Sequence, residues 1–133
     1  MTLILRKRHL DEIVEDSLQV YPKEACGVLA GRVNNAKVVE AVFKARNVLA
    51  SEARYEIGAE EQLAIFQKIE DLMLEIVGFY HSHPYWEATP SATDTSLAFY
   101  KGTSYTIYSI MTRTLASYTW DGEYFIPEEI IIV

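Results

Sequence analysis

Segments of two kinds alternate along this chain, and their order constrains the fold more than any other feature. Residues 25–31 are small and apolar, as in a fully buried strand, whereas residues 9–20 and 59–74 repeat apolar side chains with a helical period. Two shorter segments complete the prediction: residues 91–101 are expected to form a short helix, and residues 54–57 an extended piece. The remaining segments are rich in β-branched and aromatic residues and predict strands over 37–48, 75–83, 104–111, 117–126 and 129–133. We therefore expect one α/β domain over residues 1–133, a mixed β-sheet with flanking helices.

The apolar stripes of the two long helices predict which side chains face the sheet. In the first helix they are Leu10, Ile13, Val14 and Leu18, and in the second they are Leu63, Phe66, Ile69 and Met73. The basic run of residues 6–9, which ends in His9, is interpreted as a solvated entry into the first helix. Asp121-Gly122 lies between aromatic-rich segments and predicts a hairpin turn.

The charge of the chain excludes two classes of partner. Twelve Lys and Arg against nineteen Asp and Glu leave a net charge of −7. Nucleic acids and anionic membranes require a basic face, and no apolar run approaches the roughly 18 residues of a membrane span. The single cysteine, Cys26, excludes an internal disulfide and favours a reducing compartment. We expect a soluble cytoplasmic protein that binds neither nucleic acid nor membranes.

A candidate metal site lies where the strand predicted over 75–83 ends. Side chains two positions apart on a strand point to the same face, so the imidazoles of His81 and His83 can reach one point. Asp94 follows eleven residues later, in the first turn of a predicted helix, and can return to that point. Two histidines and one carboxylate leave a fourth position open, which is typical of catalytic zinc. Because bound zinc lowers the pKa of water to about 7, the pattern predicts a hydrolase with one Zn²⁺ per chain.

A hydrolase also needs a group that moves protons and a donor for the developing oxyanion. Glu24 immediately precedes the buried strand, an unusual location for a carboxylate unless it faces a cleft. Ser91 lies three residues before Asp94, so we expect its hydroxyl near the metal. This spacing also fits a helix capping box. We expect helix capping and metal binding to coexist only in part, because the same Asp94 oxygen cannot serve both.

Each of these residues has a structural alternative. Glu24 could be a solvated charge after a proline turn, and Cys26 is most simply a small buried hydrophobic residue. A cysteine hydrolase that pairs Cys26 with His81 or His83 is the rival enzyme, although it gives Ser91 and Asp94 no shared purpose. Tyr85 and Trp86, which follow Pro84, either cover the core or hold an extended peptide tail beside the metal.

The complete pattern resembles the JAMM motif of the MPN+ metalloisopeptidases at every position. It consists of Glu24, then His81-Ser82-His83, seven residues, Ser91, two residues and Asp94. The segment over 22–31 also resembles the first strand of that family, and the likeness in element order extends over residues 3–120. The resemblance implies the MPN fold, a three-layer arrangement similar to that of cytidine deaminases.

The resemblance also implies a role for each residue of the motif. His81, His83 and Asp94 would ligate zinc, Glu24 would be the general base that later protonates the leaving amine, and Ser91 would stabilise the oxyanion. The chain resembles the compact prokaryotic members of the family. Their partners are ubiquitin-like sulfur-carrier proteins, whose C-terminal Gly-Gly tail they trim or release from a cysteine or lysine.

Other functions stay open at this point. One is a zinc peptidase that acts on small peptides, and another is a non-catalytic MPN binding module, although such modules lack the metal residues that this chain keeps. A homodimer is also expected as an alternative, because aromatic residues near the C-terminus form either a dimer face or part of the sheet. These residues are Tyr118, Trp120, Tyr124 and Phe125.

Overall fold

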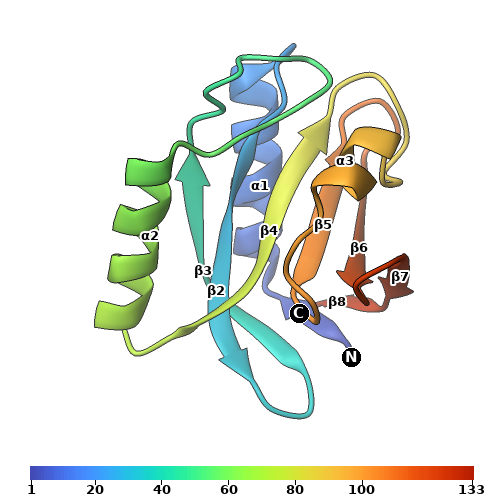
Figure 1. The fold of residues 1–133 in the computed structure, drawn as a ribbon. Helices are drawn as coiled ribbons and strands as arrows, with labels where there is room; N and C mark the ends of the chain where they lie inside the picture. The colour runs from blue at the N-terminus through green and yellow to red at the C-terminus, as the bar shows by residue number, and fades with distance from the viewer.

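An eight-stranded mixed β-sheet organises the protein, and helices lie on both of its faces (Figure 1). The computed structural model describes residues 1–133. The elements in chain order are β1 (Leu3–Leu5), α1 (Lys7–Val20), β2 (Cys26–Val33), β3 (Lys37–Ala45), α2 (Ala59–Asp71), β4 (Glu75–His83), α3 (Ala92–Leu97), β5 (Ser104–Ser109), β6 (Thr114–Trp120), β7 (Phe125–Glu128) and β8 (Ile130–Ile132). The predicted α/β class, with a mixed sheet and flanking helices, is confirmed.

Strand β4 lies at the centre of the sheet, whose order is β7-β6-β5-β4-β2-β3-β1-β8. It pairs antiparallel with β2 and parallel with β5. Gly78 allows the close approach of β5, because a Cβ atom at this position would meet the main chain of Ser104. The carboxyl end of β4, where His81 and His83 lie, is therefore held by a neighbour on each side.

The two edge strands of the sheet are consecutive in the chain. Only Glu129 separates β7 from β8, yet β7 pairs with β6 at one edge and β8 with β1 at the other. The sheet must therefore curl so that its edges approach each other. A buried ion pair lies at this closure: Lys37 Nζ, at the start of β3, is 3.1 Å from Glu128 Oε1, at the end of β7. The Lys37 ammonium also donates to Ser104 Oγ at 2.9 Å.

The core is divided into two clusters by the sheet, because neighbouring residues of a strand point to opposite faces. On one face Ile13 of α1 packs in a cluster with Leu29 and Tyr80. On the other face Ile65 and Ile69 of α2 pack with the sheet residues Val28, Ala30, Phe79, Tyr105 and Trp120. Helices α1 and α2 thus cover opposite faces, and the expected three-layer arrangement is confirmed (Figure 1).

The predicted helix stripes are partly wrong. Leu63 and Met73 are 71% and 83% exposed, whereas Ile69 is buried as predicted and Ile65, which the predicted stripe omits, is buried with it. In α1, Leu18 is exposed while the polar residues Asp16 and Ser17 are buried. Their polar groups are satisfied, because Tyr80 donates to Asp16 Oδ2 at 2.6 Å and Ser17 donates to the Ile13 carbonyl at 2.7 Å. Hydrophobic periodicity cannot identify buried residues of this kind.

Some segment ends also differ from expectation. The sequence did not predict β1, and the third helix ends at Leu97, after which Ala98 is extended. His9 is buried rather than solvated, and its Nδ1 accepts the Arg6 main-chain N–H at 3.2 Å.

The Asp121-Gly122 hairpin is confirmed: Gly122 has φ = 103° and connects β6 to β7. The aromatic residues of this hairpin pack mainly within the protein. Trp120 and Tyr118 both contact Phe125, while Tyr124 is largely exposed. None of the helices is long and apolar enough to cross a bilayer.

Candidate metal centre

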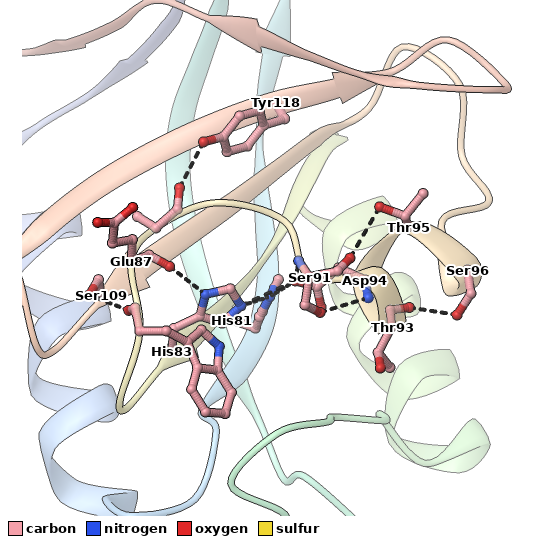
Figure 2. A network of polar contacts seen from close by, with 12 residues as sticks. His81, His83, Glu87, Ser91, Thr93, Asp94, Thr95, Ser96, Ser109 and Tyr118 are labelled. Carbon is pink, nitrogen blue, oxygen red and sulfur yellow. Dashed lines mark hydrogen bonds and ion pairs between the residues drawn. The ribbon is translucent and has the colours of Figure 1, made fainter.

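Three side chains that the sequence predicts as ligands meet at one point (Figure 2). His81 and His83 lie at the end of β4, and Asp94 lies in the first turn of α3. The Nε2 atoms of the two histidines are 3.2 Å apart, and Asp94 Oδ2 is 3.2 Å from His81 Nε2 and 3.1 Å from His83 Nε2. All three side chains are buried or nearly so.

The donor set fits a zinc ion. Three donors at about 2.0–2.2 Å from one ion, at tetrahedral angles, lie about 3.3–3.6 Å apart. The observed separations of 3.1–3.2 Å are close to this range. His83 Nδ1 lies 2.7 Å from the Glu87 carbonyl, which can only accept, so the ring proton is on Nδ1 and the lone pair is on Nε2. That lone pair faces Asp94, an arrangement that calls for a cation between them.

The surroundings of Asp94 favour its negatively charged form. Burial alone would raise the pKa of its carboxyl group, but the two adjacent imidazoles and the hydrogen bond from the Ser91 main chain lower this pKa well below the usual range. Ser91 and Asp94 also form the predicted capping box of α3. The expectation that cap and cluster would use different oxygens is wrong here. Asp94 Oδ2 both accepts the Ser91 N–H at 2.9 Å and faces the imidazoles.

Glu24 is buried beside this cluster. Its side chain is 1% exposed, and Oε1 has no hydrogen-bond partner. Burial, followed by the negative charge of Asp94, raises the pKa of Glu24 to about 9. The alternative of a solvated charge is therefore wrong. A buried carboxyl oxygen without a partner is costly unless something fills the space that it faces.

Two residues that the sequence did not single out hold Glu24 in place. Ser82, between the two histidines, accepts the Ala25 N–H on Oγ at 2.7 Å and donates its own N–H to the Ala25 carbonyl at 3.1 Å. Asn47 donates its side-chain amide to the Glu24 carbonyl at 3.1 Å. The residue after Glu24 is thus tied to the centre of the His-Ser-His motif, 57 positions away. Only the register between β2 and β4 reveals this link.

Tyr55 is another residue of the site that the sequence did not single out. Its ring stacks on the His81 imidazole with centroids 4.6 Å apart and an interplanar angle of 23°. It also lines a cavity of about 210 Å³ that opens on His81 and Asp94 and whose other walls include Leu97, Tyr105 and Phe125. The expected extended segment over 54–57 therefore forms one wall of a space next to the metal ligands.

The remaining candidates fall into two groups. Tyr85 and Trp86 are 43% and 38% exposed, so they do not serve chiefly to cover the core, and the Trp86 ring lies 6.0 Å from the His83 ring. Cys26 is buried opposite His81 in the β2–β4 register. Burial, with nearby negative charges, raises the pKa of the Cys26 thiol to about 12. A thiol that stays protonated is a poor nucleophile, which disfavours the cysteine hydrolase.

Comparison with known proteins gives the family. Residues 6–121 match the family model described as prokaryotic homologs of the JAB domain. The chain belongs to this family. It is 41% identical over 105 residues to the desampylase of Haloferax volcanii, an alignment that covers 78% of this chain and 74% of the relative. It is 34% identical over 107 residues to the CysO-cysteine peptidase of Mycobacterium tuberculosis, covering 80% of this chain and 73% of the relative.

Solved structures agree with this family. A solution structure of a protein from Desulfitobacterium hafniense has a TM-score of 0.90 and 31% identity, over 98% of this chain and 92% of the other. A JAB1/MPN domain protein from Archaeoglobus fulgidus has a TM-score of 0.63 at 19% identity, over 98% of both chains, and supports the fold alone. The resemblance to the JAMM/MPN+ family that the motif indicated is thus confirmed. This JAB-domain protein is a homologue of JAMM metallopeptidases, and its His81, His83 and Asp94 cluster is consistent with the zinc site of that family.

Proposed function

We propose that this JAB-domain protein is a zinc-dependent (iso)peptidase that hydrolyses the amide bond after the C-terminal Gly-Gly tail of a ubiquitin-like or sulfur-carrier protein. His81, His83 and Asp94 would hold one Zn²⁺ per chain. A zinc ion so held polarises a carbonyl group and lowers the pKa of water. The observation that carries the proposal is the cluster of three converging donors beside a buried carboxyl oxygen without a partner.

Glu24 moves the proton in this proposal. It takes a proton from the attacking water and later delivers it to the leaving amine, as a general base and then a general acid. Burial, followed by the charge of Asp94, raises the pKa of Glu24 to about 9, and a cation held by Asp94 would lower this pKa. A pKa near the working pH suits a group that must both accept and release a proton. The tethers from Ser82 and Asn47 fix the main chain on which this carboxyl group is mounted.

Ser91 stabilises the oxyanion. Its Oγ accepts the Asp94 N–H at 3.0 Å, and this bond uses a lone pair and leaves the hydroxyl hydrogen free to donate. A fixed donor aimed at the oxygen on which charge develops contributes more than a mobile one, because it needs no reorganisation during the reaction. The helix cap therefore orients the residue that supports the transition state.

The cavity next to the cluster suits a narrow peptide tail. A cavity of about 210 Å³, lined by Tyr55, Tyr105 and Phe125, lies beside the cluster and can receive the last residues of such a tail. Tyr85 and Trp86 are exposed near His83 and would hold the chain on the other side of the scissile bond. The relatives named desampylase and CysO-cysteine peptidase support a conjugate of a ubiquitin-like or sulfur-carrier protein as the substrate.

Several finer points stay predictions. They are a single catalytic domain over 1–133, a cytoplasmic location and a homodimer. Of the four aromatic residues near the C-terminus that were considered for a dimer face, Tyr124 is the largely exposed one. Cleavage of small peptides by the same centre is the second candidate activity. A binding module without catalysis is disfavoured, because all five motif residues are present.

The test uses a sulfur-carrier protein that carries a short C-terminal extension after Gly-Gly. Intact-mass spectrometry should detect cleavage after the second glycine, its loss in the presence of a chelator, and its recovery when Zn²⁺ is added back. A free peptide with the same last residues tests the second candidate. Cleavage that resists the chelator but stops after thiol alkylation would contradict the proposal and revive Cys26.

A further inference from the structure

The loop that connects β4 to α3 is fixed by its main-chain carbonyl groups. Residues 84–90 form no helix or strand, yet they separate His83 from Ser91 and Asp94. The carbonyls of Trp86, Glu87 and Ala88 each accept one hydrogen bond from a side chain outside the loop (Figure 2). The donors are Ser109 Oγ at 2.6 Å, His83 Nδ1 at 2.7 Å and Tyr118 Oη at 2.8 Å, respectively.

The direction of the outer two bonds is fixed. Ser109 Oγ accepts the Thr112 N–H at 3.1 Å, so its own hydrogen is directed to the Trp86 carbonyl. Burial raises the pKa of Tyr118, and its hydroxyl therefore keeps the proton that it donates to the Ala88 carbonyl. Ser109 and Tyr118 lie on β5 and β6, which are paired in the sheet, so both donors are mounted on rigid strands.

The middle carbonyl, that of Glu87, is thereby held against His83. We infer that Ser109 and Tyr118 are positioning residues for the metal centre: they hold the loop so that the Glu87 carbonyl keeps the hydrogen of His83 on Nδ1 and its lone pair on Nε2. Outer hydrogen bonds of this kind set the tautomer and the ring orientation of ligating histidines. Because His83 and Ser109 are also direct partners in the β4–β5 register, the ring and the loop share one support. This inference rests on the metal site of the proposed function.

The sequence offers matched controls. Ser17 donates its hydroxyl to the Ile13 carbonyl at 2.7 Å and is fully buried, as Ser109 is, but it lies on α1. Tyr80 donates to Asp16 at 2.6 Å on the opposite face of the sheet from the histidines. Ser17→Ala and Tyr80→Phe therefore remove hydrogen bonds of the same chemical kinds, at positions at least as buried, and destabilise the fold without touching the loop.

The experiment measures Zn²⁺ affinity by competition with a chromogenic chelator in the wild type and four variants. We expect Ser109→Ala and Tyr118→Phe each to weaken Zn²⁺ binding by about 10-fold, the lower end of the effect of losing an outer hydrogen bond of a ligand, because both act on His83 through the Glu87 carbonyl. Ser17→Ala and Tyr80→Phe should lower the melting temperature but leave the affinity within about threefold of wild type. Nitrogen-15 spectra of the metal-free protein should show His83 protonated on Nδ1 in the wild type and a mixture of tautomers in the two loop variants.

Two results would overturn the inference alone. One is wild-type Zn²⁺ affinity in both loop variants, and the other is an equal loss of affinity in the control variants. Failure of the wild type itself to bind Zn²⁺ would overturn the proposed function, and this inference with it. If Ser109→Ala does not fold, the more conservative Tyr118→Phe, at a half-buried position, carries the test.

Discussion

Ser91 and Asp94 hold each other at the start of α3: the Asp94 N–H donates to Ser91 Oγ at 3.0 Å, and the Ser91 N–H donates to Asp94 Oδ2 at 2.9 Å. The same Oδ2 faces both imidazoles. One local motif thus begins the helix and presents an anion to the candidate metal centre. Its two functions can be separated by substitution.

Asp94→Asn should keep the cap but lose most of the metal affinity. The amide oxygen can still accept the Ser91 N–H, whereas the negative charge is gone. We expect Zn²⁺ affinity to fall by more than about 100-fold, beyond the loss typical of an outer hydrogen bond. Asp94→Ala should lose the affinity and also destabilise the first turn of α3, by about 1 kcal/mol. Zinc competition and thermal unfolding measure the two effects, and wild-type affinity in Asp94→Asn would show that Asp94 is not a ligand.

Glu24→Gln should separate catalysis from metal binding. The side chain keeps its size but cannot take a proton, so we expect the kcat for Gly-Gly cleavage to fall by at least about 100-fold. Zinc content should equal that of the wild type, because Glu24 is not among the three converging donors. Turnover and metal content are measured on the same preparation. A variant that retains wild-type turnover would exclude Glu24 as the general base.

The same substitution predicts a pH-dependent change in stability of the metal-free protein. Glu24 has a pKa of about 9 in the folded protein, raised by burial and by Asp94, against an ordinary value of 4.5. Between these values the folded state holds a proton that the unfolded state has lost, so this group makes the fold less stable as pH rises. Glu24→Gln should therefore stabilise the protein progressively above pH 4.5. Urea unfolding at pH 4 and at pH 8 measures the difference, which would be the same at both pH values if Glu24 were solvated.

Lys37 of β3 and Glu128 of the edge strand β7 form a buried ion pair where the sheet curls. Both charges are buried, and Glu128 Oε2 also accepts the Ser117 hydroxyl at 2.6 Å. Lys37→Met leaves the Glu128 carboxylate buried without its cation, so we expect a loss of about 3–5 kcal/mol in the free energy of unfolding. The double variant Lys37→Met/Glu128→Leu should be less destabilised than Lys37→Met alone. Denaturant unfolding tests this, and a loss below about 1 kcal/mol, typical of an exposed pair, would contradict it.

The parts of the centre that the sequence predicts are those that depend on local geometry. His81 and His83 share a face because they are two positions apart on a strand, and Ser91 and Asp94 meet because they are three apart at a helix start. The choice of Glu24 owed much to the family motif, since its position before a buried strand also fits a solvated charge. The core strands were predicted for the same local reason, from their apolar and β-branched composition.

The parts that escaped prediction depend on register between distant segments. The tether from Ser82 to Ala25 spans 57 positions, and the link from Lys37 to Glu128 spans 91. Tyr55 stacks on His81 from a segment without regular structure. The stripe of α1 was misjudged because Asp16 is buried by a hydrogen bond from Tyr80 rather than by its own hydrophobicity. Such contacts become visible only when the sheet order is known.

Zinc titration of the metal-free protein tests the central claim most directly. The account predicts that the wild type binds one equivalent of Zn²⁺, and that His81→Ala and His83→Ala each lose this binding while their far-ultraviolet circular dichroism is retained. The core clusters do not depend on the ion, so the fold should survive. A wild type that takes up no Zn²⁺ in excess, or a His83→Ala variant that binds it equally well, would contradict the account.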